Sequence, residues 1–322
     1  MRWRLAQFPS IRGCLMNIPT GQAESRCERI PVSAIILTYN EQVNIETCLR
    51  SVQGWCQDIF VVDSGSTDDT LALCRRYTER IYTHAYVDHA SQWIWSLNEL
   101  PIPCDWVIPL DADHVVTEEL RRQMMDAVLK PDTIVNGYFA RHEYYFWGKR
   151  MRGFKPHSMR LFRRSRTHVD RSELVDYRFV VSGKTKNLSG ILRESNRKED
   201  SIDFWIDKHQ KFSSNVAVEE ILRRSGDLAW SLTPRLWGNP DERIIWLKNC
   251  WYEMPLYIRP FLYFLYRYIV RLGFLDGTNG LVYHFLQAFW FRLLVDIKIA
   301  EIRRRLAMGQ VSLEQLNASI RG

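Results

Sequence analysis

Two carboxylates one residue apart, Asp111 and Asp113, are the feature of this sequence with the clearest chemistry. They follow an apolar run at residues 106–110, whose length and polar boundaries predict a buried strand. Because alternate residues of an extended segment share a side, both carboxylates can converge on one cation. A hard divalent ion prefers carboxylate oxygens and often also binds substrate phosphates. The simpler alternative is a solvated loop that caps a helix beginning near residues 117–120.

Polar side chains also follow two earlier predicted strands, at residues 32–38 and 59–63. These side chains belong to Thr38, Asn40, Glu41, Asp63, Gly65 and Ser66. The carboxyl ends of parallel strands form the ligand crevice of an open α/β sheet, so three such clusters predict one site. Asp63 could accept from a base N–H or a ribose hydroxyl, and Gly65 permits a tight turn. Alternatively, Asn40 and Ser66 only cap the helices that follow them.

Strands and helices alternate through the first half of the chain. Strands are predicted at 32–38, 59–63, 81–84 and 106–110, with helices at 43–52, 71–74 and 91–100 between them. This alternation is typical of βαβ units and a parallel sheet, which makes the predicted class α/β. A further strand is predicted at 175–181 and a helix at 201–221.

Composition limits the classes of partner. The 322 residues suffice for one large domain or two ordinary ones, and the formal net charge of +7 suits anionic partners. The positive charge is spread along the chain rather than gathered in one motif, which disfavours nucleic acid. The seven cysteines form no C-x-x-C pair, which indicates reduced thiols in the cytosol rather than disulfides or zinc.

The C-terminal region, residues 226–322, is predicted to be helical and distinct from the rest. One face of a helical wheel there carries Tyr257, Phe261, Phe264 and Tyr268. Arg259 lies across from that face, and aromatics with arginines at the edges are typical of a helix in a membrane interface. A second segment, residues 281–297, is apolar but interrupted by His284 and Arg292, so we expect helices that lie on a membrane rather than cross it. The alternative is a buried helical pair of a soluble subdomain.

The segments 33–41, 61–70 and 110–113 together resemble the family 2 glycosyltransferases of the GT-A fold. The branch that they resemble most makes lipopolysaccharide core or exopolysaccharide repeats. The resemblance covers roughly residues 31–225 and extends more loosely into the C-terminal region. It implies a mostly parallel, twisted sheet with helices on both faces.

The expected organisation is therefore an N-terminal tail (1–30), a GT-A domain (31–225) and a C-terminal helical segment that associates with membrane (226–322).

The resemblance also implies roles for individual residues. The nucleotide sugar would be bound by Thr38, Asn40, Glu41, Asp63, Gly65, Ser66, Gln92 and Asp111. Among these, Asp63 would meet the uracil and Gln92 would lie near the sugar. Asp111 and Asp113 would hold a divalent cation, Mn²⁺ or Mg²⁺, on the diphosphate. His114 stands where the branch often has Glu, and we do not count it as a ligand.

An inverting transfer also needs a general base for the acceptor hydroxyl. The matching segment, 173–178, offers Asp176 as the first choice and Glu173 as the alternative, although Asp176 could simply pair with Arg178. Candidates for contact with the diphosphate or the acceptor are Arg160, Arg163 and Trp147.

The predicted function is a metal-dependent inverting glycosyltransferase that moves a sugar, from a UDP-linked donor, onto a saccharide or lipid-linked acceptor. The expected location is the cytoplasmic face of the inner (plasma) membrane, as a peripheral or monotopic protein. One alternative is a nucleotidyltransferase, which also uses paired acids and a metal but normally has a Gly-rich basic loop after its first strand. Another is a non-catalytic scaffold on the membrane surface. Nucleic acid is not an expected partner.

Overall fold

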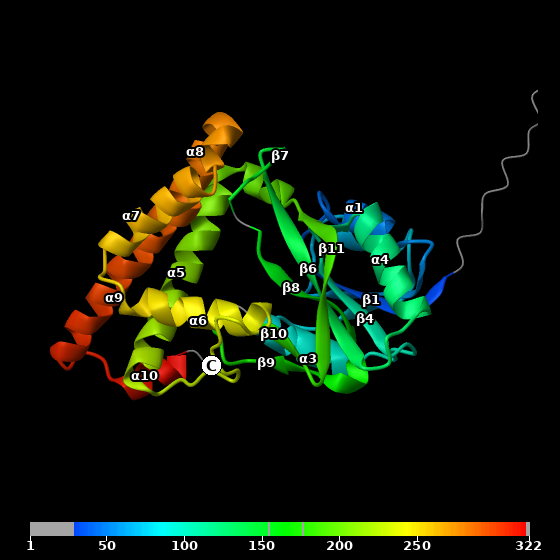
Figure 1. The fold of residues 1–322 in the computed structure, drawn as a ribbon, viewed down its shortest axis with the longest axis horizontal. Helices are drawn as coiled ribbons and strands as arrows, with labels where there is room; N and C mark the ends of the chain where they lie inside the picture. The colour runs from blue at the N-terminus through cyan, green and yellow to red at the C-terminus, as the bar shows by residue number, and fades with distance from the viewer. Residues whose placement is uncertain (1–28, 154, 176, 320–322) are drawn as a thin grey trace, which may run out of the picture.

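The computed structural model describes residues 29–153, 155–175 and 177–319 (Figure 1). A twisted sheet flanked by helices forms one half of the molecule, and a bundle of helices forms the other. Apart from its last two residues, the predicted N-terminal tail lies outside the described residues.

The central sheet has a parallel part and a mixed part. Its strands in spatial order are β3 (Ile81–Thr83), β2 (Cys56–Asp63), β1 (Ile30–Thr38), β4 (Trp106–Asp111), β8 (His157–Arg163), β6 (Val135–Phe146), β11 (Lys184–Glu194) and β5 (His114–Val116), with β7 (Lys149–Arg150) beside β6. The first four are parallel to one another, whereas β8 runs antiparallel to both of its neighbours. A separate ribbon pairs β9 (Thr167–Asp170) with β10 (Arg178–Val181). The predicted α/β class is confirmed, and the parallel part corresponds to the predicted strands.

Helices cover both faces of the parallel part, as expected for a buried parallel sheet. One face is covered by α1 (Ile45–Val52), α2 (Thr70–Cys74) and α4 (Glu118–Leu129), and the other by α3 (His89–Glu99). Strand β1 shows this directly: Ala34 and Ile36 pack in the apolar core on the side of α1, α2 and α4, whereas Ile35 packs in the core on the side of α3.

The register of the parallel strands aligns their carboxyl ends. Thr38 of β1 pairs with Asp63 of β2, and Leu37 of β1 pairs with Asp111 of β4. The polar clusters that follow these strands therefore meet at one edge of the sheet, as the sequence predicts.

The second half consists of helices that share a core with the sheet domain. They are α5 (Ile202–Ser225), α6 (Pro240–Glu253), α7 (Ile258–Leu265), α8 (Gly277–His284), α9 (Phe291–Ala307) and α10 (Leu313–Ser319). One apolar cluster joins Phe146 of β6 to Trp205 of α5 and Phe291 of α9. The predicted domain boundary at residue 225 coincides with the end of α5. Because α5 itself packs on α9 of the helical half, the division into two domains at this residue stays a prediction. None of the described helices is long and apolar enough to span a bilayer.

Helix α7 is anchored by a fully buried ion cluster. The Arg259 guanidinium donates two bonds of 2.9 Å to the Glu220 carboxylate and one of 2.9 Å, through Nε, to Asp296 Oδ1. Arg259 does lie across from the aromatic face, as predicted, but it faces the protein interior rather than solvent.

We predict that Arg259→Ala lowers the free energy of unfolding by about 3–5 kcal/mol, because Glu220 and Asp296 would stay buried without a counter-charge. Urea unfolding at neutral pH measures this loss. Arg303→Ala, at an exposed position of α9, is the control and should change stability by less than about 0.5 kcal/mol. Equal stability of the two variants would contradict the assignment.

Candidate active site

The loops that follow β1 and β2 are hydrogen-bonded to each other. The Asn40 N–H donates to Ser66 Oγ at 2.8 Å, and the Thr67 N–H donates to Asn40 Oδ1 at 2.8 Å. Asn40 has a φ of 51° and Gly65 a φ of 93°, a left-handed region that Asn and Gly tolerate best. The Asp63 carboxylate accepts the N–H groups of Gly65 and Ser66, each at 2.9 Å. Asp63 thus orders its own loop, and its contact with uracil stays a prediction.

Glu41 connects the strand ends to a later segment of the chain. Its carboxylate pairs with Lys198 and accepts from Asn44 Nδ2 at 2.7 Å, and its N–H donates to Thr70 Oγ1 at 2.7 Å. Lys198 belongs to a 3₁₀ turn (Arg197–Asp200) directly before α5. The start of the helical half is therefore tied to the candidate nucleotide pocket.

Thr38 and Gln92 are both buried next to this pocket. Gln92 of α3 donates to Ser64 Oγ at 2.7 Å and to the carbonyl oxygen of His84 at 3.0 Å. These bonds hold the end of β3 and the loop after β2 together. The predicted approach of Gln92 to the sugar stays untested.

Three carboxylates surround one imidazole at the edge of the sheet. His114 Nε2 lies 3.7 Å from Asp111 Oδ2, 4.0 Å from Asp113 Oδ1 and 3.7 Å from Glu194 Oε2. Asp111 also lies 3.1 Å from His89 Nε2. Glu194 comes from the end of β11 and was missed by sequence reasoning, because no local motif marks it.

The electrostatics of this cluster favour a bound cation. Burial raises the pKa of Asp113, and the negative charges of Glu194 and Asp111 raise it further, against the effect of His114. For Asp111, burial opposes ionisation, but His89 and His114 hold its pKa well below the usual range. Concentrated carboxylates of this kind suit a hard divalent ion, so Asp111 and Asp113 fit the predicted site.

The ligand atoms of His114, His142 and Glu194 also lie within 4.8 Å of one another. However, the Asp111 N–H donates to His114 Nδ1 at 2.9 Å, and Arg160 Nε donates to His142 Nε2 at 3.0 Å. When each ring is neutral, its remaining nitrogen carries the proton, and His142 Nδ1 donates to Glu194 Oε2 at 3.2 Å. A metal ligand would offer a lone pair there and donate through its other nitrogen. His142 therefore donates to Glu194, whereas His114 Nε2 lies 3.7 Å from the Glu194 carboxylate, beyond hydrogen-bond distance. In this arrangement neither ring offers a lone pair to a metal beside the carboxylates.

The three predicted acceptor or phosphate contacts lie in different surroundings. Arg160 is buried and donates to the carbonyl oxygen of Pro109 in β4 at 3.1 Å, so it stabilises the strand that carries Asp111. Arg163 pairs with Asp105 at 3.2 Å, at the amino end of β4. The length of β4 separates it from Asp111 by about 17 Å, so the structure does not bring Arg163 into the site. Trp147 is exposed at the β6–β7 turn and donates to the Asp200 carbonyl oxygen at 3.1 Å.

Of the two candidate bases, only Glu173 lies among the described residues. Asp176 lies outside the described residues. Glu173 is buried, accepts from Arg178 Nε at 2.6 Å and pairs with Lys248, while Arg178 also pairs with Asp241 at 2.6 Å. Because Arg178 and Lys248 already occupy both oxygens of the Glu173 carboxylate, Glu173 is not free to meet an acceptor hydroxyl, which favours Asp176.

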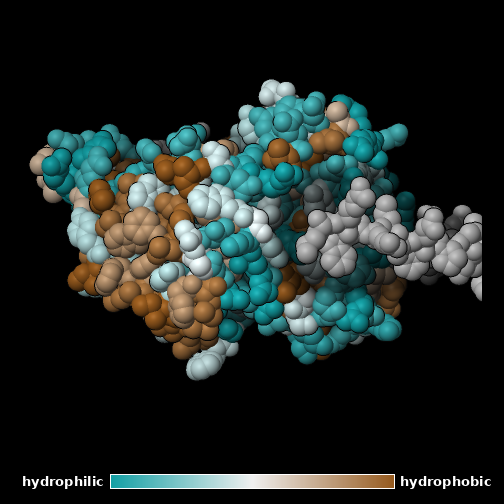
Figure 2. Space-filling model, turned by 90° about the horizontal axis from the view of Figure 1, so that it is seen from above, coloured by the Kyte–Doolittle hydropathy of each residue, from teal (hydrophilic) through white to brown (hydrophobic). Residues whose placement is uncertain are grey.

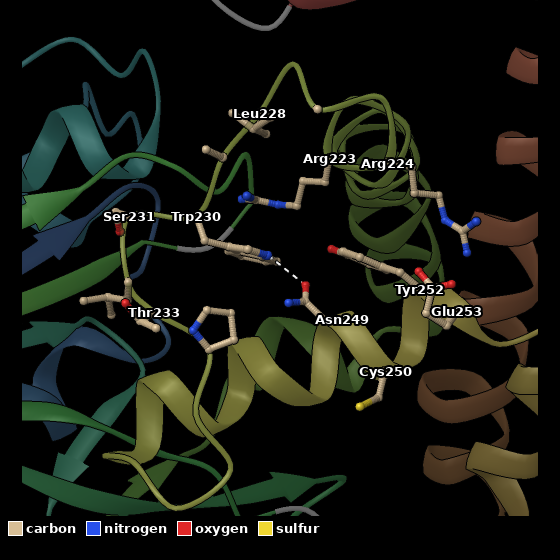
Figure 3. A pocket seen from close by; sticks show the side chains of 14 residues that line it. Arg223, Arg224, Leu228, Trp230, Ser231, Thr233, Asn249, Cys250, Tyr252 and Glu253 are labelled. Atoms are coloured by element: carbon tan, nitrogen blue, oxygen red, sulfur yellow. Dashed lines mark hydrogen bonds between the residues drawn. The ribbon is translucent and has the colours of Figure 1, made fainter.

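An open cavity of about 980 Å³ lies between the end of α5, the segment before α6, and α6 itself (Figure 3). Within it the Arg223 guanidinium stacks on Trp230, whose Nε1 donates to Asn249 Oδ1 at 2.8 Å. The lining residues all fall within 223–253 and include none of the strand-end residues. This cavity is separate from the candidate active site.

Comparison with known proteins agrees with this geometry. A family model described as glycosyl transferase family 2 matches residues 33–183. The chain is 27% identical over 279 residues to the lipopolysaccharide core biosynthesis glycosyltransferase LpsC of Rhizobium meliloti. The aligned residues make up 81% of this chain and 91% of that protein. An uncharacterized glycosyltransferase of Rickettsia conorii is 32% identical over 93 residues, 29% of this chain and 32% of that protein.

Among solved structures, glucosyl-3-phosphoglycerate synthase from Mycobacterium tuberculosis aligns over 63% of this chain and 82% of that chain, with 16% identity. The TM-score of that match is 0.39. The fold and the strand-end cluster define a glycosyltransferase of the GT-A type. Residues 33–183 thus match a glycosyl transferase family 2 domain, and the similarity of the chain to the lipopolysaccharide core branch is confirmed.

We predict that Glu194→Leu lowers the free energy of unfolding by about 1–3 kcal/mol, because the buried His142 N–H would lose its acceptor. Glu194→Gln keeps a carbonyl acceptor and should lose less. Chemical denaturation of the two variants separates these effects. Wild-type stability in the Leu variant would show that the imidazole–carboxylate network does not support the site.

Proposed function

We propose that this glycosyltransferase moves a sugar, with inversion, from a UDP-linked donor to a lipid-linked or lipopolysaccharide-type acceptor in a reaction that depends on a divalent cation. The observation that carries the proposal is the meeting of Asp111 and Asp113 with the two hydrogen-bonded loops at the carboxyl edge of the sheet. The similarity to a lipopolysaccharide core enzyme supports the acceptor class.

In this reaction the loops after β1 and β2 hold the nucleotide, with Asn40 and Ser66 fixing the shape of the pocket. A Mn²⁺ or Mg²⁺ ion held by Asp111 and Asp113 would neutralise charge on the departing diphosphate. Asp176 takes the proton of the acceptor hydroxyl as that oxygen attacks the anomeric carbon. The His142 imidazole, which donates to Glu194, and the neighbouring His114 imidazole keep the acidic strand end in place.

We propose that the acceptor approaches along the β6–β7 hairpin. Trp147 is exposed there, beside the cations Lys149 and Arg150, and its indole is fixed by the bond to the Asp200 carbonyl oxygen. An exposed indole can stack on a sugar ring, and the neighbouring cations can meet anionic groups of the acceptor.

We predict that Asp113→Asn abolishes the metal-dependent part of UDP binding, because an amide cannot supply the charge that the cation requires. Isothermal titration with UDP, with and without Mn²⁺, measures this effect. Asp105→Asn, at the opposite end of the same strand, is the matched control and should bind UDP like the wild type. Unchanged metal-dependent binding by Asp113→Asn would overturn the site.

We predict that Asp176→Asn keeps wild-type UDP affinity but lowers kcat by about 10²–10⁴-fold, because only the proton transfer is lost. Transfer assays with a UDP-sugar and membrane lipid extract report kcat. Glu173→Gln should instead lower stability, since Glu173 partners Arg178 and Lys248. Full activity of the Asp176 variant would move the base elsewhere.

Metal-dependent UDP binding without sugar transfer, together with nucleotide transfer to a phosphate acceptor, would favour the nucleotidyltransferase alternative. Absence of nucleotide binding with retained vesicle binding would favour the scaffold.

A further inference from the structure

The surface formed by residues 257–285 exposes an unusual number of large apolar side chains. The exposed ones are Tyr257, Ile258, Phe261, Leu262, Tyr266, Ile269, Val270, Leu272, Phe274, Leu275, Leu281 and Phe285. Brown, hydrophobic side chains gather over the C-terminal helices in the view from above, whereas the sheet domain is mostly teal (Figure 2). Contiguous patches of this kind mark sites of interaction with proteins or membranes. We call this surface the apolar face.

The helices beneath the apolar face have the reverse of the usual polarity. Arg259, Arg267 and His284 are buried under it, while aliphatic and aromatic side chains of the same helices point outward. Arg259 is held by Glu220 and Asp296, and the Arg267 guanidinium lies over the rings of Tyr263 and Tyr283. Helices that bury their cations against acidic and aromatic side chains and expose their apolar residues suit a non-aqueous neighbour.

Basic residues border the apolar face. Lys149 and Arg150 of the β6–β7 hairpin and Arg271 are exposed. The hairpin is attached to the face, because the Arg152 N–H donates to Asp276 Oδ2 at 2.6 Å. Asp276 is the one acidic residue in the sequence from 257 to 285, and this bond occupies it.

We propose that the apolar face docks onto an anionic lipid bilayer, with residues 257–285 in the interface and the basic border on the headgroups. A bilayer with anionic headgroups matches both the apolar centre and the positive border. A second copy of this chain matches less well, because two such faces would bring like charges together without an acidic partner. The described helices would lie in the interface rather than cross it.

Docking in this orientation would bring the candidate active site to the membrane. The hairpin that borders the apolar face also holds the 3₁₀ turn at Asp200, through Trp147. That turn carries Lys198, the partner of Glu41 in the nucleotide pocket. A lipid-linked acceptor would therefore meet the hairpin first; only this point rests on the proposed function, since docking itself does not require it.

The first test is flotation of the full chain with phosphatidylcholine vesicles, with and without phosphatidylglycerol. We expect binding to the anionic vesicles that weakens as salt rises. Hydrogen exchange on those vesicles should show protection at residues 257–285 and 147–152, a result that needs no variant. Lack of vesicle binding by the wild type, or protection elsewhere, would overturn the proposal.

The second test uses matched triple variants. The apolar-face variant is Phe261→Ser, Ile269→Ser and Leu275→Ser, and its control is Val87→Ser, Leu129→Ser and Ile134→Ser, three exposed apolar positions of the sheet domain. We expect the first to lose vesicle binding by on the order of 100-fold and the second to bind like the wild type. If both triple variants lost vesicle binding equally, or if neither lost it, docking through this face would be contradicted.

The third test reverses charge. Lys149→Glu with Arg271→Glu should lower binding to anionic vesicles by about 10-fold or more and leave binding to neutral vesicles unchanged. Arg75→Glu with Lys184→Glu, two exposed cations of the sheet domain, is the control. Metal-dependent UDP binding, measured on every variant, shows that the fold and the nucleotide pocket survive.

Sedimentation velocity on the same proteins distinguishes the alternative occupant. A wild-type dimer that becomes monomeric in the apolar-face variant, without vesicle binding, would assign the face to self-association and overturn the membrane proposal. If the protein does not float with vesicles, the proposed nucleotide site is not contradicted, because UDP binding is measured without lipid.

Discussion

The crowding of three carboxylates around one imidazole is the constraint on which this molecule's chemistry depends. Asp111, Asp113 and Glu194 lie around His114, in surroundings where unbalanced negative charge is costly. Part of that charge is met by the His142 imidazole, which donates to Glu194 and whose tautomer Arg160 fixes by donating to Nε2. The remainder is what a divalent cation on a diphosphate would balance. The supporting imidazoles and the proposed metal ligands Asp111 and Asp113 therefore lie in one cluster.

The sheet brings distant parts of the chain to this cluster. The parallel strands supply the two loops proposed to bind the nucleotide and the paired acids, whereas the mixed part supplies the supporting residues His142 and Glu194. The β6–β7 hairpin then extends from the mixed part to the apolar face of the helical half. The proposed donor pocket, the proposed acceptor approach and the proposed membrane surface thus lie next to one another along the molecule.

Much of the parallel half was predictable, because each strand is a local apolar run and each polar cluster directly follows one. The network of His142 and Glu194 that supports the site was not predictable, because only the non-local pairing of β6, β8, β11 and β5 brings these two residues together. Arg163 illustrates the same limit, since an antiparallel partner of β4 carries it to the opposite end of that strand. For α7, the helical wheel separates Arg259 from the aromatics. Which side faces outward depends on Glu220 and Asp296, far away in the sequence.

The most direct test of the central claim is the melting temperature of the purified chain with nucleoside diphosphates and UDP-sugars, each with and without Mn²⁺. A ligand that binds only the folded state stabilises it by about 2.7 kcal/mol at a concentration 100 times its Kd. If Asp111 and Asp113 hold the cation, the melting temperature should rise clearly with UDP or a UDP-sugar, and only when Mn²⁺ is present. No rise with any nucleotide, or an equal rise without the metal, would contradict the assignment of Asp111 and Asp113.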